Sequence, residues 1–226
     1  MATASSIFIG NRYLEGFRKK QEQKKKAKLL ISSIQGHIEQ LQRIMIYLKG
    51  TLSESDADVI NVEVNQIQND YIYESALKQI GVFDLKDVDI ISEYARTLSS
   101  ILRDILRSYD KERKFTNVAF QSFLKRKTDA LIIDAKLYIM ALSKRILQDD
   151  DKFNNYKELV KNDYSLIRIN GKKYGFNSEM YDSLTRNDPL KRTELLFEEF
   201  GLIAELENTY NLKKIEFEKW IQTKSS

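Results

Sequence analysis

The fold is decided in large part by residues 27–48, AKLLISSIQGHIEQLQRIMIYL. Apolar residues recur in this stretch at alternating spacings of four and three, a heptad pattern typical of a helix that buries one side. The seam consists of Ala27, Ile31, Ile34, Ile38, Leu41, Met45 and Leu48. It predicts a long helix over residues 12–49 that ends at Gly50. The seam from Ile31 onward is predicted to pack against a partner helix.

Long helices are expected elsewhere too, because the chain contains one proline and only eight glycines. Apolar periodicity predicts helices over about 59–80, 84–109 and 115–147. In the last of these, residues 130–142 are apolar on nearly every side. We expect a helix at the centre of a bundle there, with a buried strand as the alternative.

Two further signals mark helix starts. The acidic run at residues 149–151 is interpreted as the end of one helix and the N-cap of the next. Pro189 suits the first turn of a helix, and the apolar residues after it predict that this helix continues as far as Trp220.

One break in helicity is predicted. Asn170-Gly171 lies between the short β-prone runs 164–169 and 172–176, and this dipeptide favours a tight hairpin turn. The expected fold is therefore an all-α multi-helix bundle with one small β-hairpin near residues 164–176. Residues 1–50 would form a basic, amphipathic N-terminal helix packed on a helical body, 51–226, as one domain.

The composition excludes several chemistries. There is no cysteine, which removes disulfides, thiol nucleophiles and cysteine-based metal sites. His37 is the only histidine, so sites that need two histidines are impossible. No glycine-rich phosphate loop is present. We therefore expect no metal or cofactor, no catalytic residues and a non-catalytic role.

A short motif offers the one enzyme-like signal. Residues 131–136, LIIDAK, resemble the metal-binding strand of the PD-(D/E)xK nucleases. The resemblance implies Mg²⁺ held by Asp129 and Asp134, with Lys136 stabilising charge. The chain departs from the family pattern, because the two aspartates are only five residues apart and no Pro-Asp occurs. The alternative is a buried helix with polar side chains, and a helix over 130–136 removes the nuclease interpretation.

The positive charge is concentrated near the start of the chain. Residues 12–28 hold eight Lys and Arg against two Glu, a net charge of +6, so a total of +4 leaves −2 for the remainder. Such a run predicts contact with an anionic surface. The residues assigned to this contact are Arg18, Lys19, Lys20, Lys24, Lys25, Lys26 and Lys28.

Apolar residues directly precede the basic run, namely Ile7, Phe8, Ile9, Leu14 and Phe17. An apolar anchor beside a polybasic stretch is typical of proteins that bind membrane surfaces. The alternative is a solvated helix end whose apolar residues dock on the protein's own core. No segment approaches the roughly 18 apolar residues of a membrane span.

The sequence favours a non-catalytic helical interaction protein, cytoplasmic or peripheral to the membrane, of bacterial or phage origin. It would bind a protein partner or self-associate, and its basic segment would contact a membrane surface or an acidic partner. The alternative is a nucleic-acid-binding protein, including a Mg²⁺-dependent nuclease with the Asp-x-Lys motif. No small-molecule substrate is evident.

Overall fold

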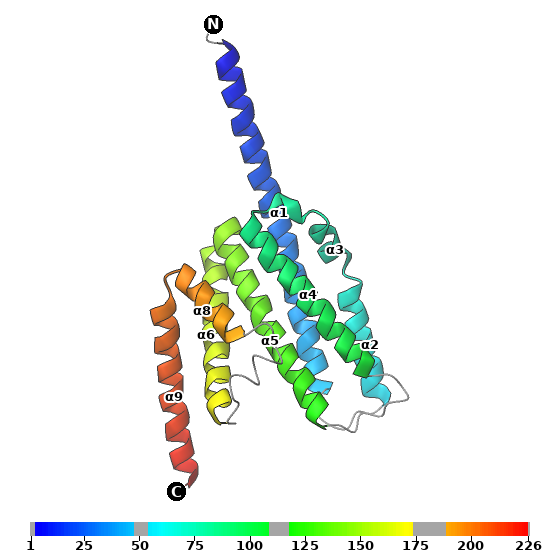
Figure 1. The fold of residues 1–226 in the computed structure, drawn as a ribbon, viewed down its shortest axis with the longest axis vertical. Helices are drawn as coiled ribbons and strands as arrows, with labels where there is room; N and C mark the ends of the chain where they lie inside the picture. Colours follow the sequence, from blue (N-terminus) through cyan, green and yellow to red (C-terminus); the bar gives the residue numbers. More distant parts are fainter. Residues whose placement is uncertain (1–2, 48–53, 109–117, 174–188, 226) are drawn as a thin grey trace.

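The computed structural model describes residues 3–47, 54–108, 118–173 and 189–225. Every regular element in these ranges is helical, which confirms the predicted all-α class. The helices pack side by side into an elongated body, and α1 extends well beyond it (Figure 1). None of the helices described combines the length and apolar character needed to cross a membrane.

Helix α1 runs without interruption from Thr3 to Tyr47. It begins nine residues before the predicted start, and no proline lies within it to break the backbone hydrogen bonds. Its second half enters the body, where the heptad residues from Ala27 to Met45 are buried. The predicted end at Leu48 to Gly50 lies outside the described residues.

The helix predicted over 59–80 is divided in the structure. Helix α2 spans Glu54–Gln68, α3 spans Tyr71–Leu77 and a 3₁₀ turn, η1, spans Ile80–Val82. The break occurs because the Asp70 carboxylate accepts a hydrogen bond from the backbone N–H of Tyr73 at 3.0 Å. A capping aspartate starts a new helix in place of continuing the old one.

The central helix is α5, Val118–Leu142, which ends in a π-helical turn, η2, at Ser143–Leu147. It packs against α1 and against three other helices, namely α4 (Leu85–Ser108), α6 (Asp150–Lys173) and α8 (Pro189–Glu199). Being surrounded explains why residues 130–142 are apolar on nearly every side. The expectation of a helix at the centre of the bundle is confirmed, and α4 closely matches its predicted range.

Helix α6, Asp150–Lys173, replaces the first part of the predicted hairpin. Asp149 caps it, since its carboxylate accepts from the Lys152 N–H at 2.9 Å, which confirms the predicted role of the acidic run. The hairpin prediction is wrong for residues 164–173, which are helical, while 174–176 lie outside the described residues. The physical reason is a continuous buried stripe, whose period of 3.6 outweighs the local turn signal. The stripe contains Phe153, Tyr156, Val160, Tyr164 and Ile169.

The last predicted helix is also divided, into α8 (Pro189–Glu199) and α9 (Ile203–Ser225). Gly201 adopts φ +70°, a left-handed conformation that glycine accepts without strain. Its N–H donates to the Glu198 carbonyl at 2.9 Å, and the Leu202 N–H donates to the Phe197 carbonyl at 2.7 Å. This pair of bonds is the Schellman helix stop, and it redirects the chain so that α9 packs along α6.

A single apolar core contains residues from α1 through α9. Helices α2 and α3 pack on α1, while α9 lies at the opposite edge of the body (Figure 1). The N-terminal half of α1 extends outside this packed body (Figure 1).

Candidate anionic-surface interface

Helix α1 leaves the body just before Ala27. Ala27 and Leu30 are fully buried, and the side-chain amide of Gln23 donates to the Val82 carbonyl at 2.8 Å. From there toward the N-terminus, every side chain from Leu14 to Glu22 is exposed. We call residues 14–26 the arm, and the bond from Gln23 to η1 marks where the arm joins the body.

The arm carries most of the basic residues that the sequence predicts to contact an anionic surface. Arg18, Lys19, Lys20 and Lys25 are exposed there, while Lys24 and Lys26 are half-buried. Lys28, just beyond the arm, is exposed as well. Among the residues that the structure describes, no carboxylate forms an ion pair with any of these seven side chains. These cations are therefore not held in ion pairs, and they outnumber Glu15 and Glu22 of the same helix, which leaves a positive field around the arm.

The cations surround the helix axis. Successive residues of an α-helix are rotated by about 100°, so Arg18, Lys19 and Lys20 point in three different directions. Lys24, Lys25 and Lys26 also point in three different directions, six residues farther along the helix. A flat anionic surface can thus approach the arm from several sides and still meet cations.

Two large apolar side chains lie at the outer end of the arm. Leu14 is 52% exposed and Phe17 is 54% exposed. Their spacing of three places them on the same side of the helix. The alternative that these anchors dock on the protein's own core does not hold for this pair. The side chains of Ile7, Phe8 and Ile9 lie outside the described set.

The heptad seam faces the interior of the protein. Ile31, Ile34, Ile38, Leu41 and Met45 are buried in the chain's own core, and Leu48 lies outside the described residues. Helices α2, α3 and α5 pack against α1. Packing within the chain thus explains why the seam is apolar. That the seam also binds a partner helix stays a prediction.

The Asp-x-Lys motif lies on helix α5, so the strand that the nuclease resemblance implies is not formed by residues 130–136. Asp134 accepts a hydrogen bond from Arg192 at 2.8 Å, and Lys136 forms an ion pair with Asp163 of α6. Both side chains thus tie α5 to its neighbours. No group of three or more His, Asp or Glu suited to a metal ion occurs in the described part of the chain.

His37 is buried between helices rather than placed in an open site. Its Nδ1 lies 3.3 Å from the hydroxyl of Tyr94, and its Nε2 lies 3.2 Å from an oxygen of Asp70. Burial lowers the pKa of His37 below its usual 6.5, and the nearby Asp70 carboxylate opposes this shift without cancelling it. Burial also raises the pKa of Tyr94. The neutral imidazole therefore belongs to the core.

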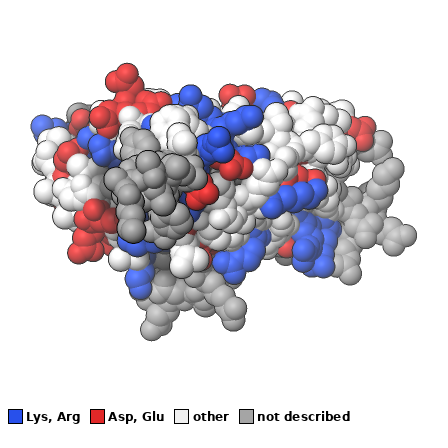
Figure 2. Space-filling view, turned by 90° about the horizontal axis from the view of Figure 1, so that it is seen from above, with Lys and Arg blue, Asp and Glu red and all other residues white. Residues whose placement is uncertain are grey.

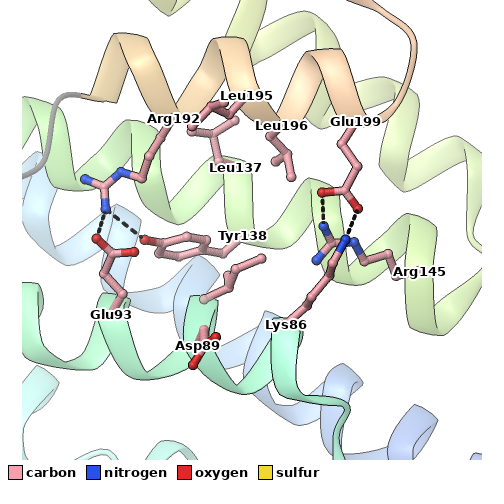
Figure 3. Close-up of a pocket in the computed structure, with 11 residues that line it drawn as sticks. Lys86, Asp89, Glu93, Leu137, Tyr138, Arg145, Arg192, Leu195, Leu196 and Glu199 are labelled. Atoms are coloured by element: carbon pink, nitrogen blue, oxygen red, sulfur yellow. Dashed lines mark hydrogen bonds and ion pairs between the residues drawn. The ribbon is translucent and has the colours of Figure 1, made fainter.

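A slot between α4, α5 and α8 is the feature that sequence reasoning missed (Figure 3). Its cavity of about 250 Å³ has an apolar floor that includes Leu137 and Tyr138. Ion pairs close both ends, Arg192 with Glu93 at one and Arg145 with Glu199 at the other. The lining residues come from distant parts of the sequence, so no local motif could reveal them. Because both arginines are paired with carboxylates, the slot holds no run of unpaired cations comparable to the arm.

The body balances its charges in the same way. Ion pairs link its helices, for example Lys127 with Asp104 and Lys157 with Glu205, each at 3.0 Å. Both signs of charge occur across the face shown in Figure 2. The basic run of the arm differs from these pairs, because no carboxylate of the described residues forms an ion pair with it.

The chain matches no protein-family model, no curated protein and no solved structure.

Proposed function

We propose that this chain is a non-catalytic helical interaction protein that attaches to an anionic surface through the arm of α1. One observation carries the proposal. The cations of the arm are collected on a helix that extends from the body, and none has an ion-pair partner among the described residues. Binding to an anionic surface would provide the missing counter-charges and release bound counter-ions.

The contacts of the body support a scaffold role. The Asp-x-Lys side chains join α5 to α6 and α8, and His37 joins α1 to the cap of α3. These polar groups hold helices together and present no nucleophile with an activating base. The body therefore serves to hold the arm, and one continuous helix connects the two.

The proposal is tested by retention on a heparin column, which presents a dense anionic surface without lipid. The variant Arg18→Gln/Lys19→Gln/Lys20→Gln removes three charges from the arm. We expect it to elute at clearly lower salt than the wild type, because fewer counter-ions are exchanged on binding.

The matched control is Lys213→Gln/Lys214→Gln/Lys219→Gln on α9, which makes the same change in net charge. Lys213 and Lys214 already pair with Glu216 and Glu218 on their own helix. We expect this variant to elute close to the wild type. Equal losses in both triple variants would show that only net charge matters and would refute the role of the arm.

A further inference from the structure

We infer that the anionic surface recognised by the arm is a phospholipid bilayer, and that Leu14 and Phe17 enter its interface. This inference rests on the proposed function and names the partner of the same site. The exposed apolar pair decides between partners. A phosphate backbone or a peptide of acidic residues alone satisfies lysine and arginine but leaves Leu14 and Phe17 in water. A lipid interface takes both the charges and the apolar side chains.

The order of residues along the arm fits a bilayer. Leu14 and Phe17 come first, and the cations from Arg18 onward follow toward the body. From Leu14 to Lys26, apolar and basic residues are thus separated along the helix axis, and Arg12 is the one basic residue on the N-terminal side of Leu14. A helix that lies flat on a membrane instead separates them around its circumference. The arm therefore meets the bilayer obliquely, with its N-terminal end deepest and the cations at the level of the lipid phosphates.

The length of the helix limits how deep it goes. Residues 3–17 make about 22 Å of helix, less than the roughly 30 Å of the hydrocarbon core. The same segment includes Arg12 and Glu15, which are costly to bury. The N-terminal part of α1, residues 3–17, accordingly stays in one leaflet, near the headgroups, and does not cross.

The attachment also orients the body. Because α1 is one helix from the arm to the core, and Gln23 ties the base of the arm to η1, the body follows the direction of the arm. Figure 1 shows the arm continuing the long axis of the molecule. The body, of net charge −2 outside residues 12–28, is then held away from the anionic surface, which would repel it.

The experiment is co-sedimentation with vesicles of phosphatidylcholine, with or without phosphatidylserine. We expect the wild type to bind only the vesicles that contain phosphatidylserine. The variant Leu14→Ala/Phe17→Ala keeps every charge, and alanine is a strong helix former. We expect it to bind these vesicles about tenfold more weakly than the wild type, because the two large apolar side chains that would leave water on binding are gone.

The matched control is Leu212→Ala/Ile215→Ala, an equally spaced pair on α9 that is 56% and 48% exposed. It should bind as the wild type does.

A second measurement reports directly whether residue 17 enters the lipid. In Phe17→Trp/Trp220→Phe, tryptophan fluorescence should be quenched by lipids brominated along their acyl chains.

Each outcome decides the inference. Unchanged vesicle binding by Leu14→Ala/Phe17→Ala, an equal loss in the α9 pair, or no quenching by brominated lipid overturns it. Binding to heparin through the arm without any binding to vesicles overturns the lipid partner while the proposed function stands. Single-stranded RNA and polyglutamate, used as competitors on the same column, would then identify which other anionic partner the arm prefers.

Discussion

At the scale of single residues, polar groups inside the body hold helices together. Asp134 on α5 is buried and bonded to Arg192 of α8, and Asp70 both caps α3 and approaches His37 of α1. Losing one member of such a pair leaves the other buried without its partner, which costs more than the pair contributes. These residues resemble functional groups in sequence, but their contacts give them structural roles.

His37 predicts a pH dependence of stability. Its pKa is lowered in the folded state by burial, so the unfolded chain takes up a proton first as the pH falls below about 6.5. Stability should therefore be lost from about pH 6.5 downward until the folded pKa is reached, by at most about 1.4 kcal/mol per pH unit. Above pH 6.5 both states are neutral and His37 adds no slope.

The check is urea unfolding of the wild type and of His37→Gln at pH 7.5 and at pH 5.5. His37 is the only histidine, so the difference between the two proteins isolates its titration. Asp70, Tyr73 and Tyr94 face it, and all three remain in the variant. The same loss on acidification in both proteins would contradict the prediction.

At the scale of elements, the backbone conformation of a single residue can determine where a helix ends. Gly201 turns the chain from α8 into α9 with a positive φ, whereas Gly36 lies within α1 in an ordinary helical conformation. A Cβ added at either glycine would meet no atom within 4 Å. Only the backbone conformation separates the two positions.

The two glycines predict opposite effects of the same substitution. Gly36→Ala should stabilise the protein by about 0.5–1 kcal/mol, because alanine loses less backbone entropy in a helix. Gly201→Ala should destabilise it by about 1 kcal/mol or more, because a side chain strains the left-handed conformation. Thermal unfolding followed by circular dichroism measures both. Shifts of the same sign would show that the chain turns differently at Gly201.

At the scale of the whole molecule, α1 combines two roles. Its second half forms a wall of the common core, and its first half extends from the body. Within the second half, only one side of the helix packs on the core. Leu41 is fully buried, while Ile46 is 62% exposed. The proposed binding by the arm and the folding of the body would thus involve separate parts of one helix.

Replacing apolar side chains of α1 by alanine tests how much the stability of the core depends on the seam. Leu41→Ala should lower the free energy of unfolding by about 2–5 kcal/mol, because it leaves a cavity in a closely packed core. Ile46→Ala should change it by no more than about 0.5 kcal/mol, since its side chain is largely in water. Urea unfolding gives both values. A tolerated Leu41→Ala would mean that the seam does not pack as described.

Much of the fold follows from the sequence. The scarcity of proline and glycine predicted the helices, apolar periodicity located α4 and α5, and the acidic run located the cap at Asp149. The breaks at Asp70 and Gly201 were missed, because each interrupts an apolar pattern that continues on both sides. The hairpin was predicted from Asn170-Gly171, a signal that extends over two residues, whereas the buried face of α6 extends over the whole helix.

For the candidate site, the sequence by itself determined where the positive charge lies, which apolar residues precede it and that paired-histidine chemistry is absent. Composition and order along the chain suffice for these conclusions. Only the tertiary structure decided that the heptad seam packs inside the chain, that Asp134 and Lys136 tie helices together and that Leu14 and Phe17 face water. The physical reason is that periodicity shows which side of a helix is apolar, while the neighbours that cover that side come from distant segments of the chain.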